Sequence, residues 1–263
     1  MLIVSEDNKK LKLALSLKEH KFREKEGAYL LEGPNLVREV LQFGGALRFV
    51  FAKASHSTEE VNQIVSLAES EGVAVYELPE NLFAKLSDTQ NSQGIIAVVE
   101  QPASGKDEFF EKTEGGMLLV LDRIQDPGNM GTLFRTAEAA GFAGVVLLKG
   151  CADVYAPKTV RSAAGSIQRL PKLFASSEEA CDMLKLKGYK LCAASMEGEN
   201  CFKTKFDPKT AIVIGNEGNG VSNEIIKSAD KIISIPMAGH IESLNAGLAG
   251  GIIMYQALQN KKE

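Results

Sequence analysis

The sequence predicts an α/β protein of two domains, of which the second is built on a mostly parallel sheet. At 263 residues the chain exceeds a typical single domain. Short apolar runs rich in Val and Ile alternate with helical segments, a pattern typical of parallel strands covered by helices. A polar, turn-rich stretch at 101–115 interrupts this alternation. We therefore expect domains at 1–100 and 116–263, joined by a linker at 101–115.

The first domain alternates strand and helix signals up to residue 100. Proline at the first helical position predicts a helix that begins at Pro34, and Ser57 with Glu60 predicts a capping box at the start of the next helix. Strands are expected at 28–32, 47–52, 73–77 and 94–99, and helices at 34–43, 57–71 and 79–86. We therefore expect one compact α/β unit.

The second domain begins with five apolar residues at 117–121, followed by the turn-forming sequence Asp-Pro-Gly-Asn at 126–129. Asn129 is expected to be the N-cap of a helix whose apolar side chains recur on one side, and Arg135 falls on the other side. Further strands are expected at 144–148, 190–194, 211–214 and 232–235, and helices at 157–168, 176–187 and 246–258. These strands supply the predicted parallel sheet.

The composition is that of an ordinary globular protein, with 44% hydrophobic and 24% charged residues. No run approaches the roughly 18 apolar residues of a membrane span, and the N-terminus lacks a signal-peptide pattern. The four cysteines are scattered, so we expect reduced thiols in a cytoplasmic protein. The three histidines show no metal-binding spacing, so we expect no metal site.

A net charge of −4 argues against a general nucleic-acid binder, but the N-terminal segment contains a local basic cluster. The cluster consists of Lys9, Lys10, Lys12, Lys18, Lys21, Arg23 and Lys25. A solvated helix face is the commoner explanation, and a patch that contacts phosphates is the alternative.

Two loops near the C-terminus indicate one binding pocket. The runs at 211–214 and 232–235 are predicted to be fully buried strands, and loops at 215–220 and 236–245 follow them. Ligands of α/β proteins bind at the carboxyl ends of parallel strands, so both loops are expected to line the same pocket. The helix at 246–258 contains three closely spaced glycines, which predicts that another backbone packs against it.

The glycine-rich loop does not match the common nucleotide-binding motifs. Gly215, Gly218 and Gly220 are spaced GxxGxG rather than GxGxxG, and the chain has no GxxxxGK[ST] sequence. The nucleophile elbow of α/β hydrolases is also missing. A nucleotide-dependent enzyme of the doubly wound type is therefore disfavoured. Thermal stabilisation by NAD or ATP, but not by S-adenosylhomocysteine, would support it.

Three blocks of the second domain resemble the signature motifs of the SpoU (TrmH-type) RNA 2′-O-ribose methyltransferases, members of the SPOUT superfamily. The blocks are DPGNMGTLFRTAEAAGF at 126–142, IVIGNEGNGVSNE at 212–224 and ISIPMAGHIESLNA at 233–246. They occur in the family's order, and the three together are specific. The first domain resembles the family's L30e-like substrate-binding domain at 21–33 and 93–97. The resemblance therefore spans nearly the whole chain.

The resemblance implies a fold and a reaction that the residues alone do not. The family's C-terminal strands and helix form a deep trefoil knot, which is rare among proteins, and S-adenosylmethionine binds in it. Family members are homodimers with catalytic loops near the subunit interface. The implied reaction is methyl transfer to the 2′-hydroxyl of a ribose in structured RNA. We favour 23S rRNA because a large L30e-like domain suits the capture of a structured RNA by its shape. Transfer RNA is the alternative target, and a catalytically silent RNA-binding or ribosome-assembly protein is the alternative function.

The resemblance also implies roles for individual residues. The positions that match cofactor contacts are Gly215, Ile235 and Leu244, with Asn216, Met237 and Asn245 beside them. The positions that match polar groups near the RNA ribose are Arg135, Asn129, Glu217, Ser243 and Asn245. From the residues alone, a loop-stabilising hydrogen bond is the usual role of a residue such as Glu217 or Asn245, and a surface ion pair that of Arg135.

The implied chemistry requires a poor nucleophile, the 2′-hydroxyl, to be positioned and to lose its proton. The family's suggested base matches Arg135, but free arginine has a pKa of roughly 12.5–13.8 and is poorly suited to accept a proton. We expect Arg135 to orient the hydroxyl and a neighbouring phosphate and to stabilise the developing alkoxide. Glu217 or solvent is then expected to accept the proton.

Overall fold

The chain folds into two compact units in the computed structural model, which describes residues 1–55, 58–89, 91–102, 105–241 and 243–260. The first unit consists of Met1–Pro102 and Tyr155–Gln168, and the second of Ala103–Val154 and Arg169–Glu263. The first unit therefore contains a short stretch that lies, by sequence, within the expected second domain.

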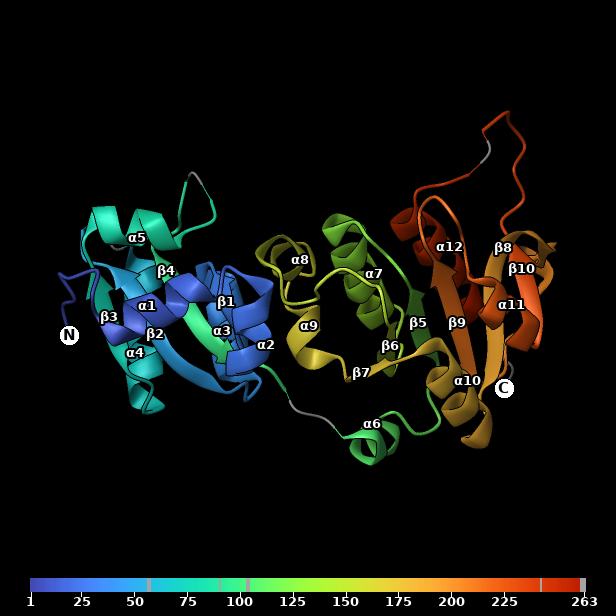
Figure 1. Cartoon of the computed structure of the whole chain (residues 1–263), viewed down its shortest axis with the longest axis horizontal. Helices are drawn as coiled ribbons and strands as arrows, with labels where there is room; N and C mark the ends of the chain where they lie inside the picture. The colour runs from blue at the N-terminus through green and yellow to red at the C-terminus, as the bar shows by residue number, and fades with distance from the viewer. Residues whose placement is uncertain (56–57, 90, 103–104, 242, 261–263) are drawn as a thin grey trace. The chain divides into compact units, whose positions relative to one another are not determined.

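The first unit is a four-stranded sheet with helices around it (Figure 1). Its elements are α1 (Lys9–Ser16), α2 (His20–Glu26), β1 (Ala28–Glu32), α3 (Pro34–Gln42), β2 (Leu47–Lys53), α4 (Glu59–Ser70), β3 (Val75–Leu78), α5 (Glu80–Leu86), β4 (Ile95–Glu100) and α8 (Pro157–Ser162). The order is β1-β4-β2-β3, with β4 antiparallel to β1 and β2, and β3 parallel to β2. The N-cap of α4 is Thr58, whose side chain accepts from the backbone N–H of Val61, and the expected capping residue Ser57 lies outside the described residues.

The stretch Tyr155–Gln168 completes the first unit. Helix α8 packs against β1, and the rings of Tyr29 and Tyr155 lie 4.8 Å apart between centroids. Arg161 forms an ion pair with Asp88 at 2.6 Å. The prediction of a single helix at 157–168 is wrong. The helix is interrupted between α8 and α9 (Ser166–Arg169), where Ala164 adopts a left-handed conformation with φ of 46°.

The second unit is a six-stranded parallel sheet in the order β10-β8-β9-β5-β6-β7, which confirms the predicted sheet (Figure 1). Its strands are β5 (Leu118–Asp122), β6 (Gly144–Leu148), β7 (Lys172–Ala175), β8 (Lys190–Asn200), β9 (Thr210–Gly215) and β10 (Lys231–Ser234). Its helices are α6 (Lys106–Lys112), α7 (Pro127–Ala139), α10 (Ser177–Leu186), α11 (Asn223–Ser228), α12 (Ala246–Gln259) and the short 3-10 helix η1 (Cys201–Lys203). The capping box of α10, Ser176 with Glu179, forms as expected.

Two expectations for this unit are corrected. The stretch 101–115 is not a plain linker, because it contains α6, and the rings of Phe109 and Phe110 are buried in the core of the second unit. Strand β10 is not fully buried, because it lies at the edge of the sheet and only Ile233 is enclosed. Strand β9, by contrast, lies inside the sheet and all six of its residues are buried.

The C-terminal helix α12 packs against α7 and β9. Its glycines face side chains rather than the backbone that we expected. A methyl group placed on Gly250 would lie 2.3 Å from Cδ2 of Leu133, and one on Gly247 would lie 3.2 Å from Cγ2 of Thr132. The chain thus runs from the edge strand β10 back to the inner strands before it ends. The knotted threading of this tail, which the resemblance implies, stays a prediction.

Most of the N-terminal basic cluster is engaged within the first unit. Arg23 is buried, and its guanidinium donates to carbonyls after α1, including that of Lys18 at 2.8 Å. Lys18 in turn donates to the carbonyl of Ser87, and Lys12 forms an ion pair with Asp7. These contacts favour a structural role for much of the cluster over a phosphate-binding patch.

The four cysteines are free thiols. None of the helices formed by the described residues is long and apolar enough to cross a bilayer. Within the same residues, no group of three or more His, Cys, Asp or Glu side chains is placed to hold a metal ion.

Candidate active site

Two loops meet the start of α7 at the carboxyl ends of β9 and β10, the edge of the sheet at which the sequence placed the pocket. We call residues 215–222 the glycine loop and residues 235–245 the second loop. Asn129, in the first turn of α7, joins them. Its side-chain N–H donates to Glu217 of the glycine loop at 3.0 Å, and its carbonyl accepts from Asn245 at the end of the second loop at 2.8 Å. Three of the expected catalytic residues therefore form one hydrogen-bonded chain.

The sequence predicted that Asn129 caps α7, and this prediction is wrong. Asp126 is the N-cap, and its carboxylate accepts from the backbone N–H of Asn129 at 2.8 Å. This places Asn129 inside the helix, where its amide is free to face the two loops. Asn245 is the residue that does cap a helix, because its side-chain oxygen accepts from the N–H of Leu248 in α12 at 3.1 Å.

The carboxylate of Glu217 is held by four donors. These are the backbone N–H groups of Gln125 and Asp126 and the side-chain amides of Asn129 and Asn216. Burial acts to raise the pKa of Glu217, but the hydrogen bonds from Asn129 and from backbone N–H groups outweigh it, so that the pKa is lowered. A carboxylate with a lowered pKa and this many donors is a weak proton acceptor. Glu217 therefore suits an anchoring role.

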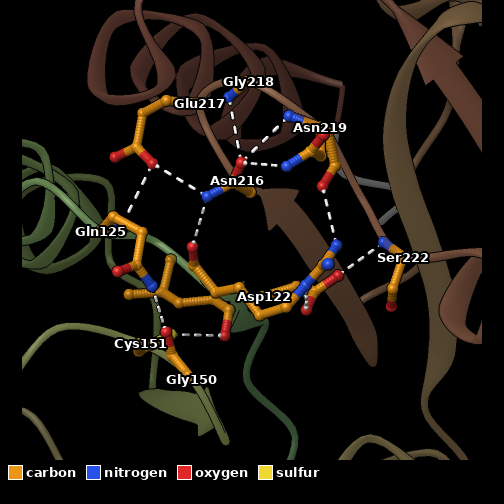
Figure 2. A network of polar contacts seen from close by, with 12 residues as sticks. Asp122, Gln125, Gly150, Cys151, Asn216, Glu217, Gly218, Asn219 and Ser222 are labelled. Carbon is orange, nitrogen blue, oxygen red and sulfur yellow. Dashed lines mark hydrogen bonds and ion pairs between the residues drawn. The ribbon is translucent and has the colours of Figure 1, made fainter.

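Asn216 gives the glycine loop its shape (Figure 2). Its side-chain oxygen accepts from the N–H groups of Gly218 and Asn219, and its amide donates to the carbonyl of Arg123 at 2.9 Å. The loop folds back so tightly that a Cβ on Gly215 would lie 2.1 Å from the backbone nitrogen of Val221, which explains why this position is glycine. The glycine loop is thus shaped both by contacts within itself and by its bond to Arg123 at the end of β5.

The described residues of the second loop, 235–241 and 243–245, make few hydrogen bonds. The backbone N–H groups of Met237 to Ile241, and those of Ser243 and Leu244, donate to no described residue. Ile235 and Leu244 are half-buried, whereas Met237 and Ser243 are exposed. Ser243 makes no hydrogen bond to any described residue, so the structure does not bring it into the chain of Asn129, Glu217 and Asn245. Unpaired main-chain groups at the end of a strand are suited to bind a ligand.

Arg135 lies on the exposed side of α7, about two helical turns after Asn129. Its guanidinium forms neither a hydrogen bond nor an ion pair with any described residue. The surface ion pair that the residue type alone favours is therefore not formed. An unpaired arginine on the helix that carries Asn129 is available to an anionic partner such as a phosphate.

Two residues at this site, Asp122 and Arg123, were missed by sequence reasoning. Asp122 ends β5 with a fully buried carboxylate that accepts from the N–H of Ser222 at 2.6 Å (Figure 2). Arg123 follows it with a left-handed φ of 59°. An aspartate at the carboxyl end of a buried strand could have indicated a role for Asp122. The left-handed conformation of Arg123 could not have been predicted, because arginine disfavours it.

Models of two protein families match this chain. Residues 116–255 match the SpoU rRNA Methylase family, and residues 8–97 match the MRM3-like substrate binding domain. The first match contains both loops, α7 and the start of α12. The second lies within the first unit.

Individual relatives match over nearly their whole length. The 23S rRNA (guanosine(2553)-2'-O)-methyltransferase RlmP of Bacillus subtilis is 33% identical over 254 residues, which cover 96% of this chain and 97% of the relative. The crystal structure of an AdoMet-bound rRNA methyltransferase from Sinorhizobium meliloti superposes with a TM-score of 0.87 at 27% identity, over 98% and 97% of the two chains. The SpoU methyltransferase AviRb of Streptomyces viridochromogenes, in complex with AdoMet, superposes with a TM-score of 0.85 at 27% identity, over 96% and 98%.

Proposed function

Because this chain belongs to the SpoU rRNA methylase family, we propose that it transfers the methyl group of S-adenosylmethionine to the 2′-hydroxyl of a ribose in RNA. The observation that carries the proposal is the hydrogen-bonded chain from Glu217 through Asn129 to Asn245. It ties both loops to the helix that bears Arg135, so a methyl donor held by the loops and an RNA held by Arg135 would meet at one place.

The residues of the two loops suit S-adenosylmethionine. The cofactor, when bound, supplies a methyl group on an electrophilic sulfonium. The unpaired main chain of the second loop can bind an adenine and an amino-acid group without charged side chains. Half-buried Ile235 and Leu244, with Met237 beside them, offer apolar contact. We assign cofactor binding to the main chain at Gly215, Ile235 and Leu244, with Asn216 holding the glycine loop in place.

Arg135 is proposed as the residue that positions the RNA. Its free guanidinium can bind a phosphate next to the target ribose and donate to the 2′-oxygen as negative charge develops on it. The new bond forms between this oxygen and the methyl carbon, the bond from sulfur to the methyl carbon breaks, and the hydroxyl proton passes to solvent. Glu217 is the weaker candidate for the acceptor, because its pKa is lowered and its oxygens are occupied. Ser243, which is exposed in the second loop, is proposed to contact the ribose.

The RNA is proposed to be 23S rRNA. The Bacillus subtilis relative is named for guanosine 2553 of that RNA, so the equivalent nucleotide is the first position to inspect. We propose that the first unit binds the RNA and the second unit carries out methyl transfer, a division close to the expected domains 1–100 and 116–263. We also propose that the protein acts as a cytoplasmic homodimer without a metal.

Transfer of labelled methyl groups from S-adenosylmethionine to unmodified transcripts tests this function. The purified chain should label a 23S rRNA transcript, with the label on one ribose, and the Arg135→Ala variant should not. If only transfer RNA became labelled, transfer RNA and not 23S rRNA would be the substrate. Binding of S-adenosylhomocysteine in a calorimeter, without transfer to either RNA, would instead favour a catalytically silent RNA-binding protein.

A further inference from the structure

Asp122 and Arg123 hold the glycine loop at three points. At its beginning, the carbonyl of Arg123 accepts from the side chain of Asn216 at 2.9 Å. At its turn, the guanidinium of Arg123 donates to the carbonyl of Gly220 at 3.3 Å. At its exit, the carboxylate of Asp122 accepts from the N–H of Ser222 at 2.6 Å. The loop is therefore fastened to the end of β5 on both sides of its tip.

The backbone of Arg123 is unusual for its residue type. Its φ of 59° is the left-handed conformation that a side chain disfavours, and such conformations persist where the surroundings enforce them, often at functional sites. The aliphatic part of the Arg123 side chain lies against Gly150. A Cβ added to Gly150 would be 3.2 Å from Cγ of Arg123. The neighbouring loop is thus shaped to receive this side chain, and the turned carbonyl of Arg123 points to Asn216.

Asp122 directs the guanidinium. Its carboxylate is buried, and a buried charge must be paired. Nε of Arg123 donates to it at 3.0 Å, which leaves the outer nitrogen of the guanidinium for Gly220. One carboxylate oxygen therefore holds the arginine and the other holds Ser222.

We propose that Asp122 and Arg123 are positioning residues for the cofactor, which they affect by fixing the shape of the glycine loop; this inference rests on the proposed function. Glu217, Gly218 and Asn219 at the tip of the loop are exposed, so a loosened loop removes little buried surface. A ligand that binds a preformed loop loses affinity when the loop must first be ordered. Loss of the guanidinium should therefore weaken cofactor binding far more than it lowers stability.

Three substitutions of Arg123 separate these effects. Arg123→Gly removes the guanidinium and accepts the left-handed φ, whereas Arg123→Ala removes it and keeps the backbone strain. Both variants should bind S-adenosylhomocysteine about tenfold or more weakly than the wild type, as the loss of one charge-assisted hydrogen bond implies. Calorimetry measures this affinity. The melting temperature of the Gly variant should equal or exceed that of the Ala variant. Arg123→Lys, which keeps the charge, should restore part of the affinity.

Kinetics with a 23S rRNA transcript supply a second readout. The KM for S-adenosylmethionine should rise in the Gly and Ala variants, and the KM for the RNA should stay within about twofold. Arg38→Ala is the matched control, because it removes an arginine–carboxylate pair (with Glu60, 2.8 Å) in the first unit and should leave cofactor affinity unchanged. Asp122→Asn, which keeps an acceptor for Ser222 but weakens the ion pair, should lower the affinity as well and serves if the Arg123 variants fail to fold.

The possible results lead to different conclusions. A wild-type chain that binds no S-adenosylhomocysteine refutes the proposed function itself. Wild-type binding that is matched by Arg123→Gly refutes the positioning role alone. An equal loss of affinity and of stability in the Gly variant, with a raised KM for the RNA, would also overturn the proposal, because it would mark Arg123 as a general structural residue.

Discussion

At the scale of single residues, every hydrogen bond to the carboxylate of Glu217 comes from an N–H group, so each of its oxygens must act as an acceptor. The four groups around it are N–H groups of Gln125, Asp126, Asn129 and Asn216. Glu217→Gln would turn an NH₂ group toward at least one of them. Because Glu217 is exposed, we expect this variant to lose only about 0.5–1.5 kcal/mol of unfolding free energy at neutral pH, measured by urea denaturation.

The pH dependence of the same variant provides its control. The folded-state pKa of Glu217 is lowered, so its carboxylate stabilises the folded chain above the unfolded value of about 4.3 and loses this effect as pH falls through the folded value. The stability difference between wild type and Glu217→Gln should therefore shrink below about pH 4. A variant of unchanged stability that transfers no methyl groups would show that Glu217 acts in catalysis after all.

Arg135 should affect the reaction without affecting the fold. Its side chain is exposed and bonds to no described residue, so Arg135→Ala should leave the melting temperature unchanged. Loss of a group that stabilises developing charge typically lowers kcat by about 10²–10³-fold. Arg135→Lys should keep part of the activity, with an unshifted pH–rate profile. Near-full activity of the Lys variant, with a profile shifted to lower pH, would instead identify Arg135 as the base.

The resemblance to the family's motifs singled out Asn129, Glu217 and Asn245, but it did not reveal how these residues are joined. Asp126 and Asn129 are both good capping residues, and Pro127, a residue favoured at the first helical position, already indicates Asp126 as the N-cap, whereas the contact of Asn129 with Glu217 spans 88 residues of sequence. The four-donor environment that lowers the pKa of Glu217 is likewise formed by tertiary contacts. The expected proton acceptor could therefore be reassessed only once the surroundings of Glu217 were known.

At the scale of elements, α12 offers a test with two adjacent glycines. A methyl group on Gly250 would overlap the buried side chain of Leu133, whereas one on Gly251 would lie at an ordinary 3.6 Å from Cγ2 of Thr136. Gly250→Ala should therefore destabilise the chain by about 1–3 kcal/mol through overpacking. Gly251→Ala should stabilise it by about 0.5–1 kcal/mol, the gain in helix propensity. Urea denaturation of both variants measures the difference, and equal effects would contradict the packing of α12 on α7.

Elements with strong local signals were predicted well, and those that depend on their neighbours were not. The inner strand β9 and the capping box of α10 follow from apolar runs and capping residues. Helix α6 was missed because its flanks are polar and turn-rich, and the burial of Phe109 depends on the sheet beside it. The exposure of β10 depends on its place at the edge, and strand order cannot be derived from one strand's composition.

At the scale of the whole molecule, the first unit should depend on residues 155–168. Tyr155 is buried against Tyr29 of β1, so Tyr155→Ala should cost this unit about 3–5 kcal/mol. Hydrogen exchange should then become faster in β1 and stay unchanged in β9. Tyr255→Ala, at a half-exposed position of α12, is the matched control and should leave exchange in β1 unaltered. Unchanged β1 exchange in Tyr155→Ala would mean that 1–102 is complete alone.

This discontinuous first unit has a practical consequence for protein engineering. A chimera that takes its first unit from one family member and its second unit from another cannot be made by a single crossover near residue 103. The transplanted half would leave behind its own α8, and β1 would meet a foreign helix with mismatched Tyr155 and Arg161 positions. Grafts that exchange 1–102 and 155–168 together preserve this packing, and should be the ones that yield active hybrids.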